Sequence, residues 1–160
     1  MVVSMDWDSY FMRIAESISL RSSDPSTKHG CVIVDSKHSV VSTGYNGPVM
    51  GFPNDKVCYD RPEKYKWMIH AEQNAIIFAQ RSLVGCTAYI TGHPCCACFM
   101  HLVQSGVKRI VYGTRMSKCL DTSDFRVIDK VSKEMKIELI NLLCDEDDVE
   151  RTTRDQSTQV

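Results

Sequence analysis

The chain has 160 residues, of which 43% are hydrophobic and 24% charged, and its 19 basic and 20 acidic residues give a net charge of −1. This length and composition predict one ordinary globular domain. The balanced charge argues against a nucleic-acid polymer as partner, and no apolar run reaches the roughly 18 residues that a membrane span needs.

Helices and strands are predicted to alternate along the chain. Apolar residues at helical spacing predict a first helix over 6–21, which a polar turn over 22–30 follows. The remaining elements are predicted as strands over 31–35 and 40–45, a helix over 70–81, a strand over 86–91, a helix over 94–105, a strand over 107–112, a helix over 121–132 and a strand over 136–143. Pro94 is expected to open its helix. This order predicts an α/β fold, a three-layer sandwich with a mixed five-stranded sheet between helices.

A long stretch over 46–66 interrupts this alternation. It contains several glycines and prolines and shows no regular period. So long a loop in a small domain is usually functional. The single domain is expected to span 1–144, and the tail over 145–160 has almost no apolar content, which predicts disorder.

Two short motifs contain three metal-ligand side chains, H-A-E at 70–72 and P-C-C-A-C at 94–98. His70, Cys95 and Cys98 offer one imidazole and two thiolates, which leaves the fourth position of a zinc ion for water. The two cysteines are three apart and face the same side of a helical turn, whose first N–H groups favour thiolates. The pattern H-x-E with P-C-x-x-C is the signature of the zinc-dependent nucleobase deaminases.

Glu72 is predicted to act on the zinc-activated water and not to bind the metal. Within a helix His70 and Glu72 would point about 200° apart, but at a helix start both can project into one cavity. Glu72 would move the proton of the water to a ring nitrogen and later to departing ammonia, as a general acid and base. The alternative is a closed structural zinc site, for which His93 or His101 could supply the fourth ligand.

The other cysteines are predicted to be structural. Eight cysteines could form four disulfides, but no secretory signal is visible, and we favour a reduced protein in the cytoplasm. Cys31, Cys86 and Cys119 are expected in strands or the core, and Cys96 as a packed small side chain. Cys58 with a nearby histidine could make a second metal site.

Beyond the zinc motifs, the chain has R-S-S-D-P at 21–25, T-G-Y-N-G-P at 43–48 and G-V-K-R-I at 106–110. With these motifs it resembles the deoxycytidylate (dCMP) deaminase family of the cytidine deaminase-like superfamily over residues 6–115. The G-Y-N-G loop separates it from tRNA adenosine deaminases and riboflavin-pathway deaminases, which share the zinc motif. The compact R-P-E-K-Y segment at 61–65 resembles phage and viral members.

The resemblance implies a zinc enzyme that deaminates dCMP to dUMP, the precursor of dTMP. It also implies a homohexamer that dCTP, with Mg²⁺, activates and dTTP inhibits. In this family Asn46 would bind the sugar, and the backbone of Ala71 and the carboxylate of Glu72 would recognise the cytosine edge. Charge and hydroxyl groups in the polar turn further predict a phosphate pocket at Arg21, Ser22, Ser26 and Lys28.

Effector binding is expected on the helix that begins at His70 and in the loop after Gly51. The residues concerned are Phe78 and Arg81 on the helix, and Asn54 and Asp55, which could hold the triphosphate and its Mg²⁺. The chain departs from the family at His29, where an apolar residue is usual, and at His93, where an aromatic residue is commoner. His93 is near enough to the zinc ligands to touch the pocket.

Three alternatives stay open at this point. The same chemistry could act on dCTP, a 5-substituted dCMP, cytidine or deoxycytidine, because the pocket wall is built by tertiary contacts. The chain could be a nucleotide-sensing subunit without activity, although the presence of Glu72 argues against this. It could also be a structural zinc protein.

Overall fold

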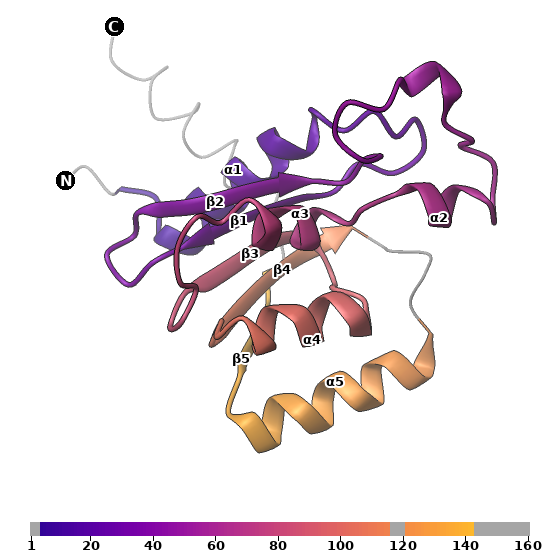
Figure 1. Ribbon diagram of the computed structural model, residues 1–160. Helices are drawn as coiled ribbons and strands as arrows, with labels where there is room; N and C mark the ends of the chain where they lie inside the picture. Colours follow the sequence, from indigo (N-terminus) through magenta and orange to yellow (C-terminus); the bar gives the residue numbers. More distant parts are fainter. Residues whose placement is uncertain (1–3, 116–120, 143–160) are drawn as a thin grey trace, which may run out of the picture.

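A mixed five-stranded sheet forms the middle layer of the computed structural model, which describes residues 4–115 and 121–142 (Figure 1). The strands are β1 (Gly30–Val34), β2 (Val40–Tyr45), β3 (Thr87–Gly92), β4 (Arg109–Arg115) and β5 (Glu138–Asn141). Their order in the sheet is β2-β1-β3-β4-β5. Strand β1 pairs antiparallel with β2 and β3, whereas β3, β4 and β5 run parallel. The predicted mixed five-stranded sheet is therefore confirmed.

Helices cover both faces of this sheet, as Figure 1 shows. One face is covered by α1 (Trp7–Ser19), and the other by α3 (Ala71–Ile77), α4 (Cys96–Gln104) and α5 (Thr122–Met135). Side chains of β1 alternate between the two layers: Cys31 and Ile33 pack on the side of α3 and α4, and Val32 and Val34 pack on the side of α1. The chain thus forms the expected α/β/α sandwich.

The two helices that follow the zinc motifs begin later than their sequence predicts. The helix expected over 70–81 begins at Ala71 and ends at Ile77, with His70 as its N-cap. The helix expected to open at Pro94 begins at Cys96, with Cys95 as its N-cap. Both N-cap residues have extended backbone, with ψ near 160° (156° and 162°), so their side chains stand outside the helical turn. Pro94 accordingly lies before the cap.

The stretch over 46–66 contains two short helices that the sequence did not predict, η1 (Asn54–Lys56) and α2 (Lys64–Trp67). Helices of three and four residues contain too few apolar positions to show a period. The stretch leaves β2 and projects beyond the sheet before it returns to α3 (Figure 1).

Some predictions concern residues that the structure does not describe. These are Cys119 and the tail over 145–160, and the extent of the domain to residue 144 likewise stays a prediction. Within the described part of the chain, no helix combines the length and apolar character that crossing a membrane requires.

Candidate active site

Two helix starts bring the three predicted metal ligands together. Nδ1 of His70 lies 3.6 Å from Sγ of Cys95 and 3.3 Å from Sγ of Cys98. All three ligand atoms lie within 4.8 Å of one another. A tetrahedral zinc ion, with bonds of about 2.0–2.3 Å to nitrogen and sulfur, needs ligand atoms at this spacing. The described residues contain no second group of three or more such ligands, so Cys58 belongs to no such group there.

The backbone around the first ligand is fixed by a local cap. Oε1 of Gln73 accepts a hydrogen bond of 3.0 Å from the backbone N–H of His70.

In the absence of a metal ion, the contact with Cys95 and burial both raise the pKa of the Cys98 thiol. A bound dication would reverse this effect, because thiolates are its ligands.

Glu72 lies in the first turn of α3 and its side chain is buried, with 6% of the residue exposed. Burial raises the pKa of its carboxyl, and the nearby His70 partly opposes the rise. A carboxyl that both accepts and returns a proton near neutral pH benefits from such a shift. The predicted pairing of a metal trio with one buried carboxyl at a helix start is therefore present.

A pocket opens over these groups, and His70, Ala71, Glu72 and Cys95 line its base. Asn46 lines the pocket as well and is 7% exposed. Most of its hydrogen-bonding capacity is used within the chain. Its Nδ2 donates to the carbonyl oxygen of Thr27 at 2.9 Å and to Oδ2 of Asp24 at 3.3 Å, and its Oδ1 accepts from the backbone N–H of His29 at 2.7 Å. Only a lone pair of Oδ1 is left for a ligand.

His29, one of the two departures from the family, also lines this pocket. Burial, with the positive charge of Arg115, lowers the pKa of His29 to about 4, so the ring is neutral. Its Nδ1 lies 3.3 Å from Oγ1 of Thr91 on β3. The neutral His29 side chain therefore gives this part of the pocket wall a polar but uncharged surface.

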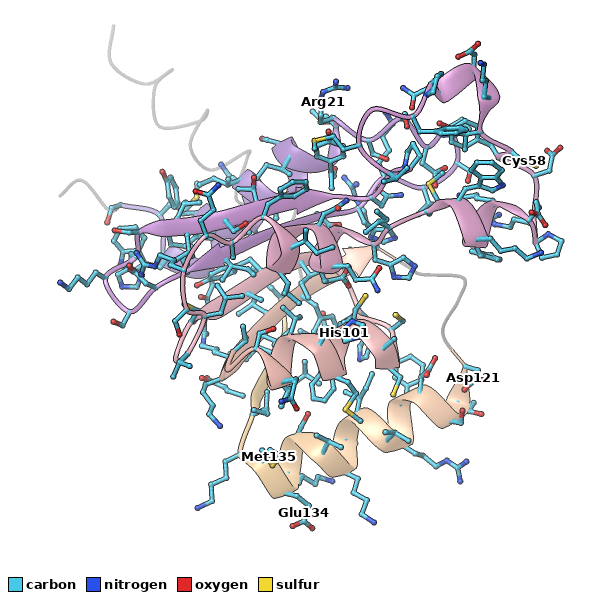
Figure 2. The ribbon with its side chains drawn as sticks, viewed as in Figure 1. Arg21, Cys58, His101, Asp121, Glu134 and Met135 are labelled. Carbon is cyan, nitrogen blue, oxygen red and sulfur yellow. The ribbon has the colours of Figure 1, made fainter. Side chains whose placement is uncertain are left out.

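The residues predicted to bind phosphate lie outside the lining of the pocket. Arg21 is exposed, with its guanidinium 5.9 Å from the centre of the Tyr45 ring, and Figure 2 shows it at the outer edge of the molecule. Oγ of Ser22 donates to the carbonyl oxygen of Asn46, and Nζ of Lys28 donates to that of Ser22, both at 2.7 Å. Oγ of Ser26 accepts a hydrogen bond from Nζ of Lys64, in the 46–66 stretch.

Lys64 and Arg61 are two cations of the pocket lining that the sequence analysis missed. Nζ of Lys64 lies 2.6 Å from Oγ of Ser26 and 2.6 Å from Oδ2 of Asp24. The exposed Arg61 reaches Oγ1 of Thr27 at 3.4 Å. The signal in the sequence was two cations within four residues of a loop that leads directly to His70. Such a signal does not say which side of the loop faces the pocket.

The four predicted effector residues lie in different parts of the chain. Nη2 of Arg81 pairs at 2.9 Å with Asp35, in the turn that ends β1. Phe78, which caps α3, is 50% exposed. Asn54 and Asp55 belong to η1, which follows the opposite end of the β1–β2 hairpin. Within one chain, therefore, these two groups do not form a common site.

His93 lines the wall of the pocket beside Cys95. Its ring centre lies 4.6 Å from that of Tyr112 and 4.8 Å from that of Phe125 on α5.

Cys31 and Cys86 are buried in the core, as predicted, at 0% and 2% exposure, and the described cysteines are all free of disulfides. Cys96, which lies between the two cysteine ligands in the sequence, is only partly buried.

Comparison with known proteins matches this geometry to one family. The family model described as "Cytidine and deoxycytidylate deaminase zinc-binding region" matches residues 5–114. A protein named "Probable deoxycytidylate deaminase" from Caenorhabditis elegans is 46% identical over 107 residues, 64% of this chain and 54% of its own length. The deoxycytidylate deaminase of Mycobacterium phage D29 is 35% identical over 121 residues, 67% of this chain and 94% of its own.

A solved structure has the same fold. The dCMP deaminase of cyanophage S-TIM5, in its apo form, superposes with a TM-score of 0.68 at 25% identity, covering 88% of this chain and all of its own. The present chain spans only about half the length of the nematode relative. The family match nevertheless includes both zinc motifs and the whole pocket base. The chain therefore belongs to the cytidine and deoxycytidylate deaminase zinc-binding family.

Proposed function

We propose that this chain is a zinc-dependent deaminase that hydrolyses dCMP to dUMP and ammonia, and so supplies dUMP for dTMP synthesis. The observation that carries the proposal is the trio of His70, Cys95 and Cys98 beside the buried carboxyl of Glu72 at the base of one pocket. The names of the nematode and mycobacteriophage relatives support the choice of dCMP.

In this proposal the three ligands hold zinc and Glu72 moves protons. Zinc, when bound, supplies a nucleophilic water at neutral pH. Glu72 takes the proton of that water, transfers it to the ring nitrogen of the cytosine, and later protonates the departing amino group. Burial of Glu72 favours this role, because a raised pKa makes its carboxylate a stronger base towards the proton of the water.

Substrate recognition uses the groups around the pocket. The backbone of Ala71 and the carboxyl of Glu72 bind the edge of the cytosine. Asn46 binds the sugar as an acceptor only, because both of its N–H donors are already engaged within the chain. A sugar hydroxyl that donates is the group that fits it.

For the phosphate we propose Arg61 as the principal ligand. Its guanidinium lines the pocket and is exposed at the side of the Ser26 and Thr27 hydroxyls. The guanidinium and the Thr27 hydroxyl are suitable donors for a phosphate dianion, whereas the Ser26 hydroxyl already donates to Oδ1 of Asp24 at 3.0 Å. The polar turn is then held in place by Arg21, Ser22 and Lys28, through their contacts with backbone carbonyl groups and with the ring of Tyr45.

Regulation is proposed on the resemblance to the family: a cytoplasmic homohexamer that dCTP activates with Mg²⁺ and dTTP inhibits. Exposed apolar side chains on α3 and the loop after it support a contact between copies, namely Ile77, Phe78 and Val84 at 64%, 50% and 76% exposure. Because Arg81 is separate from Asn54 and Asp55 within one chain, an effector site that uses all three would combine residues of two neighbouring copies.

The decisive experiment is to mix the purified protein with dCMP and follow the loss of cytosine absorbance, with and without dCTP and Mg²⁺. Turnover that rises with dCTP supports both the reaction and its regulation. The Glu72→Ala variant should lose turnover while it keeps about one zinc per chain. If zinc is lost as well, Glu72 is a ligand and the mechanism is wrong. If the wild type turns over dCTP, 5-substituted dCMP or a nucleoside in preference, the same site has a different substrate.

A further inference from the structure

Residues 48–68, here called the flap, form a wall of the pocket that is attached to the rest of the chain at a narrow neck. At the neck, Gly47 and Ile69 exchange two backbone hydrogen bonds, of 3.1 and 2.8 Å. Beyond the neck the flap projects past the sheet, and α2 lies near its return (Figure 1). A segment held in this way needs further contacts if it is to form a pocket wall of fixed shape.

Three flap side chains make such contacts, and all three reach the turn of residues 23–27. The hydroxyl of Tyr59 lies 3.1 Å from Oγ of Ser23. Arg61 approaches the hydroxyls of the turn at 3.4 and 3.5 Å, which are long distances for hydrogen bonds. Lys64 makes the short contacts, at 2.6 Å to the carboxylate of Asp24 and 2.6 Å to Oγ of Ser26.

The Lys64–Asp24 pair differs from the other ion pairs of the described residues in its burial. Its side chains are 5% and 1% exposed, whereas in every other such pair both side chains are at least 17% exposed. Taking two charges out of water is costly, so each partner strongly requires the other. Displacing the flap would separate them and leave two buried charges uncompensated.

Asp24 is itself fixed within the turn. Its Oδ1 accepts hydrogen bonds from the backbone N–H groups of Ser26 and Thr27 at 2.9 and 3.2 Å, and its Oδ2 accepts one from Asn46. The carboxylate that holds Lys64 therefore also orients Asn46, the proposed sugar ligand. Through this single side chain, the position of the flap is tied to the base of the pocket.

The flap and the turn meet at the end of the pocket where Arg61 offers its charge. Arg61, Lys64 and Tyr65 line this end from the flap, and Asp24 and Thr27 line it from the turn. The proposed phosphate site beside Arg61 therefore adjoins the line along which the flap meets the turn. We expect a phosphate chain longer than one group to require that these two walls part.

We infer that the buried Lys64–Asp24 ion pair is a positioning element that holds the flap on the 23–27 turn and thereby excludes nucleotides with more than one phosphate. This inference rests on the proposed function and concerns its substrate class. Lys64 acts through the placement of the flap, whereas Arg61 touches the phosphate.

The test compares kcat/KM for dCMP, dCTP and deoxycytidine in the wild type and in Lys64 variants, each with its zinc content measured. In Lys64→Met the preference for dCMP over dCTP should fall at least about tenfold, with deoxycytidine turnover changed much less. Lys64→Arg, which keeps the charge, should retain most of the preference. The matched control is Lys66→Met, on the same short helix, where the ion pair with Glu63 is exposed.

Hydrogen exchange measured on the same samples separates positioning from general instability. Amides of residues 48–68 should exchange faster in Lys64→Met, while those of β1 and β3 stay protected. If Lys64→Met does not fold, the double variant Lys64→Met/Asp24→Asn, which buries no single charge, should show the same loss of preference. An unchanged ratio of dCMP to dCTP turnover in a folded variant overturns the inference. Failure of the wild type to deaminate any of the three compounds overturns the proposed function instead.

Discussion

Gly44 on β2 lies against the backbone of Ala71, so closely that a β-carbon at position 44 would stand 2.1 Å from the carbonyl oxygen of Ala71. The same atom would stand 2.4 Å from the backbone nitrogen of Ala75. Real side chains do not approach backbone atoms to such distances, so the start of α3 is seated directly on the strand. Because Ala71 lies between His70 and Glu72, this contact sets the height of the metal ligand and the carboxyl above the sheet.

Replacing Gly44 with Ala should therefore damage the active site. The methyl group must push α3 away from β2, and overpacking of this kind costs about 1–3 kcal/mol. We expect the free energy of unfolding to fall by this amount, and zinc content and turnover to fall with it. Gly47→Ala is the control, since its nearest neighbour is the ring of Tyr45 at 3.8 Å. Equal zinc content in the two variants would contradict the prediction.

Arg61→Met should weaken phosphate binding without altering the chemical step. A charge-assisted contact to a dianion that is present in both the ground and the transition state contributes to KM, so KM for dCMP should rise about 10- to 100-fold with kcat nearly unchanged. Steady-state kinetics with dCMP and deoxycytidine measures this directly, because deoxycytidine has no phosphate to lose. Arg21→Met is the comparison: a larger rise in that variant would move the phosphate to the polar turn.

Asp8→Asn should reduce stability at neutral pH and weaken its dependence on acid. Arg109 forms a fork with both oxygens of Asp8, at 2.7 and 2.6 Å, and this contact lowers the pKa of the Asp8 carboxyl. The ionised pair stabilises the fold above the unfolded pKa of about 3.9, and this contribution is lost as pH falls through the lower folded pKa. Since both side chains are about a quarter exposed, at 26% and 25%, we expect a loss of about 1–2 kcal/mol at pH 7.

Urea unfolding of both proteins at pH 7 and below pH 4 tests this prediction. The difference between wild type and Asp8→Asn should shrink as the solution is acidified. Asp129→Asn breaks an exposed ion pair with Lys133 on α5 and should change stability little at either pH. A difference that stays constant from neutral to acid pH would show that Asp8 contributes by packing and not by charge.

Metal removal should destabilise the protein and be reversible with zinc. A ligand that binds only the folded state stabilises it by an amount that grows with the logarithm of its free concentration, so chelation should lower Tm by several degrees and added zinc should restore it. Cys98→Ala removes one ligand and should abolish both the restoration and the bound zinc. Cys96→Ser alters the neighbouring, partly buried cysteine and should behave as wild type. Loss of zinc from Cys96→Ser would mean that the ligand set is wrong.

Features with a period or a short spacing could be predicted from the sequence. The short apolar run of β1 and the helical spacing in α1 predicted those elements to within a residue or two, and the H-x-E and P-C-x-x-C spacings identified a trio that does come together. The starts of α3 and α4 were predicted too early, because an N-cap with extended backbone looks in sequence like the first residue of the helix.

The cations of the pocket could not be predicted in the same way. Lys64 pairs with Asp24 across 40 positions of sequence, and α2 has only four residues. Nothing local distinguishes this lysine from the exposed Lys66 two residues later, whose side chain is 76% exposed against 5% for Lys64. Which of two neighbouring lysines is buried depends on the path of the flap, and long-range contacts decide that path.

His70 and Cys95 stand at the N-caps of α3 and α4, 25 residues apart in the chain, with Cys98 one turn further on. An ion bound by all three would therefore act as a cross-link between two helices that pack against each other. A shift of one helix against the other by a fraction of an ångström would stretch its bonds before it disturbed the core. Metal occupancy should then report the relative placement of α3 and α4 more sensitively than any measure of overall stability.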